Sequence, residues 1–383
     1  MVEVSMAVLP ITDFHEYAFA VVPALTPGPI DSGVVGNTDQ LLALGTAWDA
    51  IEQRFPSPMQ RSDWSLTCMH AFQHRGKPEM LVDAVEGTLT GVAPLIIDRS
   101  TWPVRAVLAG VADLQEPMDL VYADDSALTR LTERMADLHI PLVLDRLPQD
   151  SPTIAALRRA FAGRGLIIER ARPTFPFIRL SQEWEDPAAQ LSSRRRGDLR
   201  RAWKRATAFG KVACEVLTPK PRELDDLFDD ALQVEARSWK GDVGTALLHD
   251  PIRAAFYRRY SQAACRRGTL RLCRLRFGDT IVAVQFAIED ARRFWLLKIG
   301  YDEQFARCSP GNLLVCETLR YAARRGLESY EFLGSSDNWT RVWTRDERQT
   351  VCMQIYPYNA AGLAALAQQM LTQVTKRWSC SPS

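Results

Sequence analysis

The chain has 383 residues, 46% hydrophobic and 24% charged, a composition typical of globular proteins and unlike that of disordered or fibrous ones. This length exceeds what one hydrophobic core usually supports and predicts two domains of roughly 190 residues each. The net charge is +1, but residues 1–180 carry −7 and residues 181–383 carry +8, so an anionic ligand is expected in the second half.

The residue types disfavour several classes of site. The eight cysteines form no C-x-x-C pair and the five histidines no H-E-x-x-H motif, so we expect neither a metal site nor a disulfide framework. No stretch approaches about 18 uninterrupted apolar residues, so no transmembrane segment is predicted, while peripheral membrane contact stays open. Glu3 stands where a secretory signal would carry a basic residue, and a cytoplasmic protein is expected.

Periodicity and turn signals define the first half. Residues 1–37, rich in Pro and Gly towards their end, are expected to form a flexible lead-in, and residues 38–180 a first domain. Its predicted elements are helices 38–54 and 57–74, strands 79–85, 88–97 and 103–109, helix 125–138, strand 140–146, helix 151–164 and strand 166–171.

Residues 181–210 are predicted to link the domains through a basic helix over 191–209. Its apolar positions share one face by i, i+3 and i, i+4 spacing, and Ser192 or Ser193 is the expected N-cap. Seven Lys and Arg fall within twelve residues, which is one mark of nucleic-acid binding. The charged stripe has no interleaved aromatic residues, so a solvated face between the domains, or contact with an anionic small molecule, is favoured over nucleic acid.

Residues 211–383 are expected to form a second domain that repeats the order β-α-α-β-β-β-α-β of the first. Its predicted elements are strand 212–217, helices 222–238 and 251–267, strands 269–277, 280–288 and 293–300, helix 312–325, strand 328–333, a helical turn near 337–344, strand 349–356 and helix 360–377.

The most informative stretch joins the strand 293–300 to the helix 312–325 through a loop of small residues. A pyrophosphate needs unpaired backbone N–H groups, a positive helix end and room for close approach, and such a loop offers all three. The expected ligands are Arg307 and the N–H groups of Ser309, Gly311, Asn312 and Leu313. An ordinary capped strand–helix connection is the alternative.

Four segments together resemble the GNAT superfamily, and more closely its cellulose- and exopolysaccharide-associated acetyltransferases, which are related to the Fem-type aminoacyltransferases. They are LSSRRRGDLRRAWKRATAFG (191–210), EARSWKGDVG (235–244), GYDEQFARCSPGNLL (300–314) and EFLGSSDNWTRVW (331–343). The resemblance implies an α/β (α+β) fold of tandem GNAT-like domains, each a mixed, mostly antiparallel sheet flanked by helices. It also implies acetyl-CoA or another acyl-CoA as co-substrate, bound to the second domain, while the first shapes the acceptor site without catalysing.

The sequence departs from the family at two places. GNAT proteins usually show R/Q-x-x-G-x-G/A in the phosphate loop; here Arg307 is kept and the glycine is displaced to Gly311. The relatives also tend to carry Tyr-Lys in the last motif, where this chain has Trp339 and Thr340. These departures indicate an altered substrate or a lost activity.

Direct attack of an acceptor on the thioester needs an oxyanion donor and a base. Backbone N–H groups around Ile299 and Tyr301 are the candidate oxyanion donors. Glu331 is the first candidate base, followed by Asp337 and Asp302, although each carboxylate has a surface role as its alternative.

Acceptor contacts are expected around Trp239, with Glu235 and Arg237, because GNAT proteins bind acceptors between the first two helices. An aromatic platform flanked by charges suits a sugar, and the alternative is a helix-end Trp buried on the sheet. Arg341 is a further candidate.

The leading hypothesis is therefore an acyl-CoA-dependent N- or O-acyltransferase, most simply an acetyltransferase, that acts on a sugar or glycan precursor in polysaccharide or cell-envelope assembly. The resemblance leaves two alternatives open. One is a Fem-like transferase that uses aminoacyl-tRNA, and the other is a non-catalytic GNAT-fold scaffold in a polysaccharide-synthesis complex.

Overall fold

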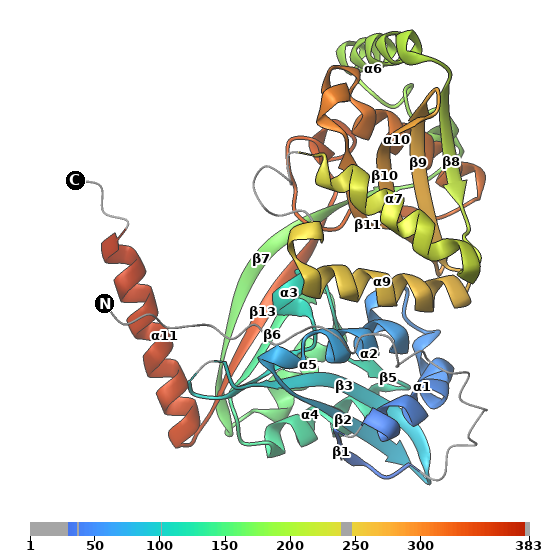
Figure 1. Cartoon of the computed structure of the whole chain (residues 1–383). Coiled ribbons are helices and arrows are strands. Elements are labelled where there is room, and N and C mark those ends of the chain that lie inside the picture. The colour runs from blue at the N-terminus through green and yellow to red at the C-terminus, as the bar shows by residue number, and fades with distance from the viewer. Residues whose placement is uncertain (1–29, 37, 101, 239–246, 380–383) are drawn as a thin grey trace, which may run out of the picture.

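The computed structural model describes residues 30–36, 38–100, 102–238 and 247–379, which form two stacked halves (Figure 1). The helices are α1 (Thr38–Glu52), α2 (Ser62–Ala71), α3 (Val111–Leu114), α4 (Asp125–Asp137), α5 (Pro152–Ala160), α6 (Ser193–Ala206), α7 (Leu224–Ala236), α9 (Pro251–Arg266), α10 (Pro310–Arg324) and α11 (Ala360–Ser379). The first half contains α1–α5, and the second half contains α6, α7, α9 and α10.

The strands form one mixed sheet that runs through both halves. They are β1 (Gly33–Val35), β2 (Gly76–Val85), β3 (Thr88–Asp98), β4 (Arg105–Leu108), β5 (Val121–Tyr122), β6 (Leu142–Pro148), β7 (Gly165–Arg179), β8 (Val212–Leu217), β9 (Leu270–Phe277), β10 (Thr280–Asp290), β11 (Arg293–Tyr301), β12 (Ser329–Glu331) and β13 (Glu347–Pro357). Their order is β1-β2-β3-β4-β6-β13-β7-β12-β11-β10-β9-β8, with β5 paired to β3. The first half contains β1–β6, most of β7 and β13, and the second half contains β8–β12. Among the described strands only β4–β6 and β11–β12 pair in parallel, so the expected α/β class with a mostly antiparallel sheet is confirmed.

Strand β7 joins the halves. Its first part, from Gly165 to Pro176, pairs with β13, and its last three residues, Phe177 to Arg179, pair with β12 on the opposite edge. Strand β13 therefore lies between β6 and β7 in the first half, although it follows the second half in the sequence. Val351, Met353 and Ile355 of β13 are buried in the first half's core, which explains this placement. The division at residues 180 and 211 itself stays a prediction.

The remaining differences from the expected elements are local. The predicted helix 57–74 is divided into a 3-10 turn, η1 (Pro58–Gln60), and α2, because Arg61 between them is extended at φ −78° and ψ 147°. The predicted strand 166–171 continues to Arg179 as β7, and β1 forms within the expected lead-in. Ser192 is the N-cap of α6: its hydroxyl accepts a hydrogen bond from the Arg195 N–H at 3.4 Å.

Helix α9 lies across the top of the first half and packs on α2, so the two halves meet through aromatic side chains (Figure 1). The buried Trp64 ring of α2 meets Phe256 and Tyr260 of α9 edge-on, at centroid distances of 5.1 and 4.8 Å. Such pairs add about 0.5–1.5 kcal/mol beyond the area they bury.

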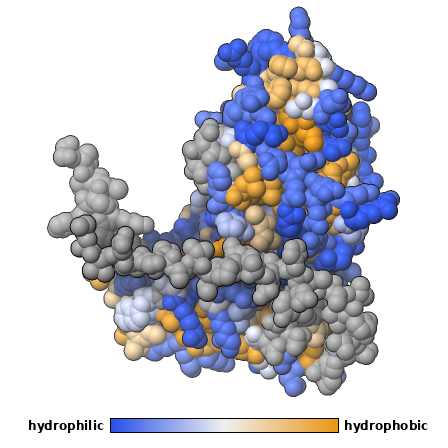
Figure 2. All heavy atoms as spheres, in the orientation of Figure 1, coloured by the Kyte–Doolittle hydropathy of each residue, from blue (hydrophilic) through white to orange (hydrophobic). Residues whose placement is uncertain are grey.

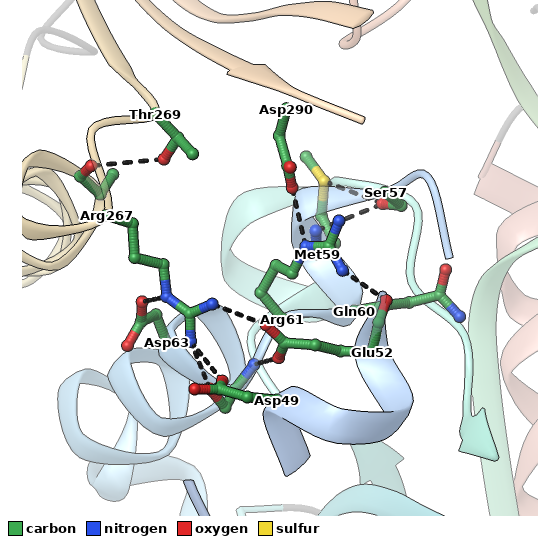
Figure 3. A network of polar contacts seen from close by, with 12 residues as sticks. Asp49, Glu52, Ser57, Met59, Gln60, Arg61, Asp63, Arg267, Thr269 and Asp290 are labelled. Carbon is green, nitrogen blue, oxygen red and sulfur yellow. Dashed lines mark hydrogen bonds and ion pairs between the residues drawn. The ribbon is translucent and has the colours of Figure 1, made fainter. Parts of the chain in front are cut away.

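An ion-pair network flanks this aromatic contact (Figure 3). The Arg267 guanidinium, just after α9, donates to Glu52 at 2.6 Å, to Asp49 at 2.7 Å and to Asp63. Arg61 of the first half pairs with Asp290 of the second at 2.7 Å. Burial works against the charged form of Arg267, but its three acidic neighbours outweigh burial and raise its pKa. The network therefore stays ionised and fixes α9 against α1 and α2.

We expect Trp64→Ala to lower the free energy of unfolding by about 3–5 kcal/mol, because it leaves a cavity between α2 and α9. Urea denaturation measures this loss. Trp102→Ala is the matched control, since the Trp102 side chain is 72% exposed and its removal leaves no cavity. Equal stability of the two variants would show that the halves do not depend on this contact.

Candidate functional site

Strands β11 and β12 diverge, and the site is built around the opening. They pair only from Arg293 to Trp295 on β11, and within the described residues the remainder of β11 pairs with β10. A bulge follows, since Ala287 of β10 faces Leu296 and the next β10 residue, Phe286, faces Lys298. Leu297 is the extra residue, and bulges of this kind redirect side chains beside active sites. The edge of β11 beyond Trp295 thus has no strand beside it on the β12 side.

The turn after β11 leads into α10 through a strained residue. Asp302 caps the 3-10 turn η7 (Glu303–Cys308), accepting a hydrogen bond from the Gln304 N–H at 3.0 Å. Ser309 then adopts the left-handed conformation, with φ 49° and ψ 50°, directly before the helix. A non-glycine residue in this region is costly, and such strain gathers at functional sites.

The first turn of α10 presents two backbone amides rather than the four expected. The Ser309 N–H donates to the Ala306 carbonyl at 2.9 Å, and the Leu313 N–H donates to the Ser309 carbonyl at 3.1 Å, so both are engaged. The N–H groups of Gly311 and Asn312 lie in the turn that has no intrahelical acceptor, and the Ser309 side chain does not cap them. A Cβ on Gly311 would lie 3.4 Å from the Tyr301 ring, so the loop packs closely on β11.

The basic helix α6 lies beside this helix end. A cleft of about 520 Å³ between them is lined by Ser192, Arg194, Arg195, Asp198, Leu199, Ala202, Arg205, Ser309, Asn312 and Val342. Arg195 fixes α6 there, donating to the carbonyls of Arg341 at 2.8 Å and Val342 at 2.7 Å. Three guanidinium groups and the positive end of α10 thus border one cavity, which suits an anion.

A second groove, of about 330 Å³, continues between α6 and α10 on the other side of Leu199. It is lined by Trp203 and Arg200 of α6 and by Cys316 and Arg320 of α10, among others. In Figure 2 the tip of the molecule, where α6 lies, shows hydrophilic residues around a smaller hydrophobic patch. The combination of an aromatic ring and cations can hold a planar base next to phosphates.

Glu331, the first candidate base, lies in an ion pair. Its side chain is fully buried at the end of β12, and Arg348 of β13 donates to both of its oxygens, at 2.8 and 2.6 Å. The Ser329 hydroxyl adds a bond of 2.6 Å. With both oxygens engaged, Glu331 is well suited to join β12 to β13, and this geometry does not favour a role in proton transfer.

The other two candidate bases also accept hydrogen bonds from neighbouring residues. Asp302 is buried and accepts from Arg237 Nε at 2.7 Å, in addition to capping η7. Asp337 is exposed in the loop before η8 (Thr340–Val342), and the Ser335 hydroxyl donates to it at 3.2 Å.

The expected acceptor residues gather at the end of α7 only in part. Glu235 is buried and packs on Gly300, whose Cβ position would lie 2.9 Å from the Glu235 Cα. Its carboxylate accepts from the Leu247 N–H at 2.9 Å. Arg237 pairs with Asp302, Arg341 lines a separate hollow with Arg345, and Trp239 lies outside the described residues. The exposed Arg307 guanidinium lies in η7, near the cleft.

One further titratable group lies near the bulge of β11, and no sequence pattern indicates it. Glu116 of the first half is buried there, with Lys298 of β11 and Tyr257 of α9 among its neighbours. It is a single acid in a loop after α3, and only the tertiary structure brings it to the second half.

Among the described residues, no three His, Cys, Asp or Glu side chains are grouped as metal ligands. No helix in that part of the chain is both long and apolar enough to span a membrane.

Comparison with known families gives one match. Residues 193–341 match the family described as "Acetyltransferase (GNAT) domain". No curated protein matches the chain significantly.

Solved structures share the whole fold at low sequence identity. A conserved protein of unknown function from Bacteroides thetaiotaomicron is 12% identical, with 85% of this chain and 99% of that chain covered and a TM-score of 0.55. The C-terminal domain of a protein described as a lysylphosphatidylglycerol synthetase, from Agrobacterium fabrum, is 11% identical, covering 87% and 95%, with a TM-score of 0.53. FemX is 11% identical, covering 89% and 99%, with a TM-score of 0.52. The similarity extends over both halves, so it concerns the paired arrangement and not the second half alone.

We expect Arg348→Leu to lower the free energy of unfolding by about 3 kcal/mol, because it leaves the buried Glu331 carboxylate without its main cation. The double variant Glu331→Gln with Arg348→Leu removes that charge and should recover most of the loss. Denaturant unfolding of both variants measures the difference. A single variant as stable as the wild type would contradict the structural role assigned to this ion pair.

Proposed function

Residues 193–341 match the GNAT acetyltransferase domain family, and from that match we propose that the chain is an acyl-CoA-dependent N- or O-acyltransferase of the GNAT superfamily. The observation that carries the proposal is the meeting of the first turn of α10, through Ser309 and Asn312, with three arginines of α6 at one cleft. A diphosphate is the ligand whose charge and size match that arrangement.

The donor is proposed to lie across the opening between β11 and β12. The N–H groups of Gly311 and Asn312 hold the pyrophosphate, while Arg307 and the α6 arginines neutralise its charge. Ile299 and Tyr301 border the pantetheine path, because Gly311 packs against both side chains. The groove beside Trp203 receives the adenosine end. This assignment keeps Ser309 and Leu313 as loop-shaping residues and not as amide donors.

The chemistry proposed is direct attack of an acceptor amine or hydroxyl on the thioester carbonyl. The part of β11 beyond Trp295, with which β12 does not pair, borders the place where a carbonyl between β11 and β12 would need a hydrogen-bond donor. One backbone donor to the oxyanion is worth about 3 kcal/mol of transition-state stabilisation. Acetyl-CoA is the simplest donor, and the reaction is proposed to take place in the cytoplasm.

The acceptor is proposed to be a sugar or glycan precursor of polysaccharide or cell-envelope assembly. It would enter between the halves, near the end of α7, where Glu235 and Arg237 lie beside Gly300 and the turn after β11. Charged side chains such as these can hydrogen-bond a hydroxyl-rich ligand.

The aminoacyl-tRNA alternative rests on a separate observation. The fold likeness to FemX covers both halves, and α6 offers a basic surface. Thr340, at the place where the Fem-type relatives carry Lys, disfavours this alternative and equally motivates the scaffold alternative.

We expect the protein to bind CoA with micromolar affinity and Gly311→Glu to abolish that binding, because a carboxylate would stand beside the two amides. Isothermal titration with CoA measures both. Ser126→Glu is the matched control, since Ser126 is exposed in the first turn of α4 and adds the same charge at a different helix end. Wild-type protein without affinity for CoA would overturn the transferase assignment.

We expect thiol release from acetyl-CoA to accelerate when a suitable amino sugar is added, which a thiol reagent detects across an acceptor panel. CoA binding without turnover on any acceptor would favour the scaffold. Binding of bulk tRNA that weakens steeply with salt, in the absence of CoA affinity, would favour the aminoacyl transferase.

A further inference from the structure

A buried carboxyl group of the first half lies against the reactive region of the second. Glu116 follows α3, and its side chain is 6% exposed. Its Oε2 atom has no hydrogen-bond partner within the described residues. An unpartnered buried carboxylate oxygen is costly and calls for an explanation, and perturbed titratable groups of this kind cluster at functional sites.

Charged and titratable groups from three other elements face Glu116. Lys298, next to the bulge of β11, and Arg146, on β6, supply positive charge. Tyr257 of α9 is buried with its hydroxyl unpartnered, and the Lys298 ammonium lies 5.1 Å from the centre of its ring. The backbone N–H of Gly334, after β12, also favours the ionised carboxyl, and Gly334 is exposed. Glu116 therefore has neighbours from both diverging strands, Lys298 of β11 and Gly334 after β12, and Gly334 is exposed to solvent.

The other acids near the opening differ from Glu116 in one respect. Arg348 occupies both oxygens of Glu331, and Arg237 with the Gln304 N–H occupies those of Asp302. Both of these carboxylates are therefore committed to contacts that hold the fold together. Arg146, by contrast, donates to the Pro173 carbonyl at 2.8 Å and not to Glu116.

We propose that Glu116 is the general base of the transfer, so that the active site is composed of both halves. The inference rests on the proposed acyltransferase function. The acceptor nitrogen or oxygen forms a bond to the thioester carbonyl carbon, and its proton passes to Glu116 Oε2. The C–S bond breaks, the electron pair leaves with sulfur, and Glu116 returns the proton to the thiolate. The products are the acylated acceptor and the CoA thiol.

The protonation behaviour of Glu116 agrees with that role. Burial raises the pKa of the carboxyl to about 7, because desolvation outweighs the opposing effects of Lys298, Arg146 and the Gly334 N–H. A base is most effective when its pKa is near the working pH. The same property makes Glu116 measurable without any substrate.

Folding is linked to this proton. Because the folded-state pKa lies above the unfolded value of 4.5, the folded protein holds a proton that the unfolded chain releases, and stability falls as pH rises from that value towards 7. Glu116→Gln removes the ionisable group and should unfold at a higher temperature than the wild type at pH 8. The difference should shrink as pH falls to 4.5. A variant less stable than the wild type at both pH values would overturn the account of a strained, unpaired carboxyl.

The deciding experiment measures acyl transfer by wild type, Glu116→Gln and Glu116→Asp against pH, with CoA titrations of each. We expect Glu116→Gln to lower kcat by about 10²–10⁴-fold, to remove the rising limb of kcat/KM near neutral pH and to leave the CoA dissociation constant unchanged. Glu116→Asp keeps a carboxyl and should recover part of the rate. Glu133→Gln, an exposed acid on α4, is the control that should retain full activity.

The outcomes separate this inference from the function on which it rests. Wild-type protein that binds no CoA overturns both. Wild-type turnover with Glu116→Gln equally fast, and with the same pH dependence, overturns the role of Glu116 and leaves the transferase assignment intact. Loss of rate together with loss of CoA affinity also overturns it, because a base does not hold the donor.

Discussion

The position of every group at the site depends on β7, a single strand of 15 residues that is paired on both edges. On one edge it holds β13, and at its last three residues it holds β12 on the other. Strand β12 can therefore extend only three residues before the chain must leave the sheet, and β11 loses its neighbour at Trp295. The opening between β11 and β12 follows from this pairing. A longer β12 would close the place where a thioester could lie.

Charge is arranged around this opening by the same geometry. Helix α10 follows β11 after the short turn η7, and its positive end borders one cleft with the arginines of α6. The carboxylates nearby are neutralised one by one, Glu331 by Arg348 and Asp302 by Arg237. Within the described residues, Glu116 differs from these acids in having a buried oxygen without a hydrogen-bond partner. Electrostatic pairing thus separates the acids that hold the fold together from the acid available for chemistry.

Local patterns in the sequence predicted the elements well, because helix periodicity, capping residues and turn signals act over a few positions. The helix over 312–325, the hairpin around Gly278 and the small-residue loop before α10 all depend on such signals. The pairing of β13 with β6 and β7 was not predictable, since nothing in Glu347–Pro357 indicates which strand will accept its hydrogen bonds. The same reason hid the ion pair of Glu331 and the position of Glu116. Both depend on contacts between segments far apart in the chain, and the second needs an interface between the halves.

The interface between the halves matters for the proposed chemistry, because the base belongs to the first half and the acyl donor is bound by the second. Misplacement of a catalytic group by about 1 Å can cost a factor of 100 in rate. Glu116 approaches β11 only because α9 is fixed on α1 and α2 by Trp64, by the Arg267 network and by the pair of Arg61 with Asp290. Two of the contacts in Figure 3, Arg267 with Glu52 and Arg61 with Asp290, are partly buried, so they resist screening by salt better than exposed pairs would. The pairing of the two halves can therefore be understood as a means of holding Glu116 at a defined place beside the second half, where Glu331 and Asp302 are engaged in contacts of the fold.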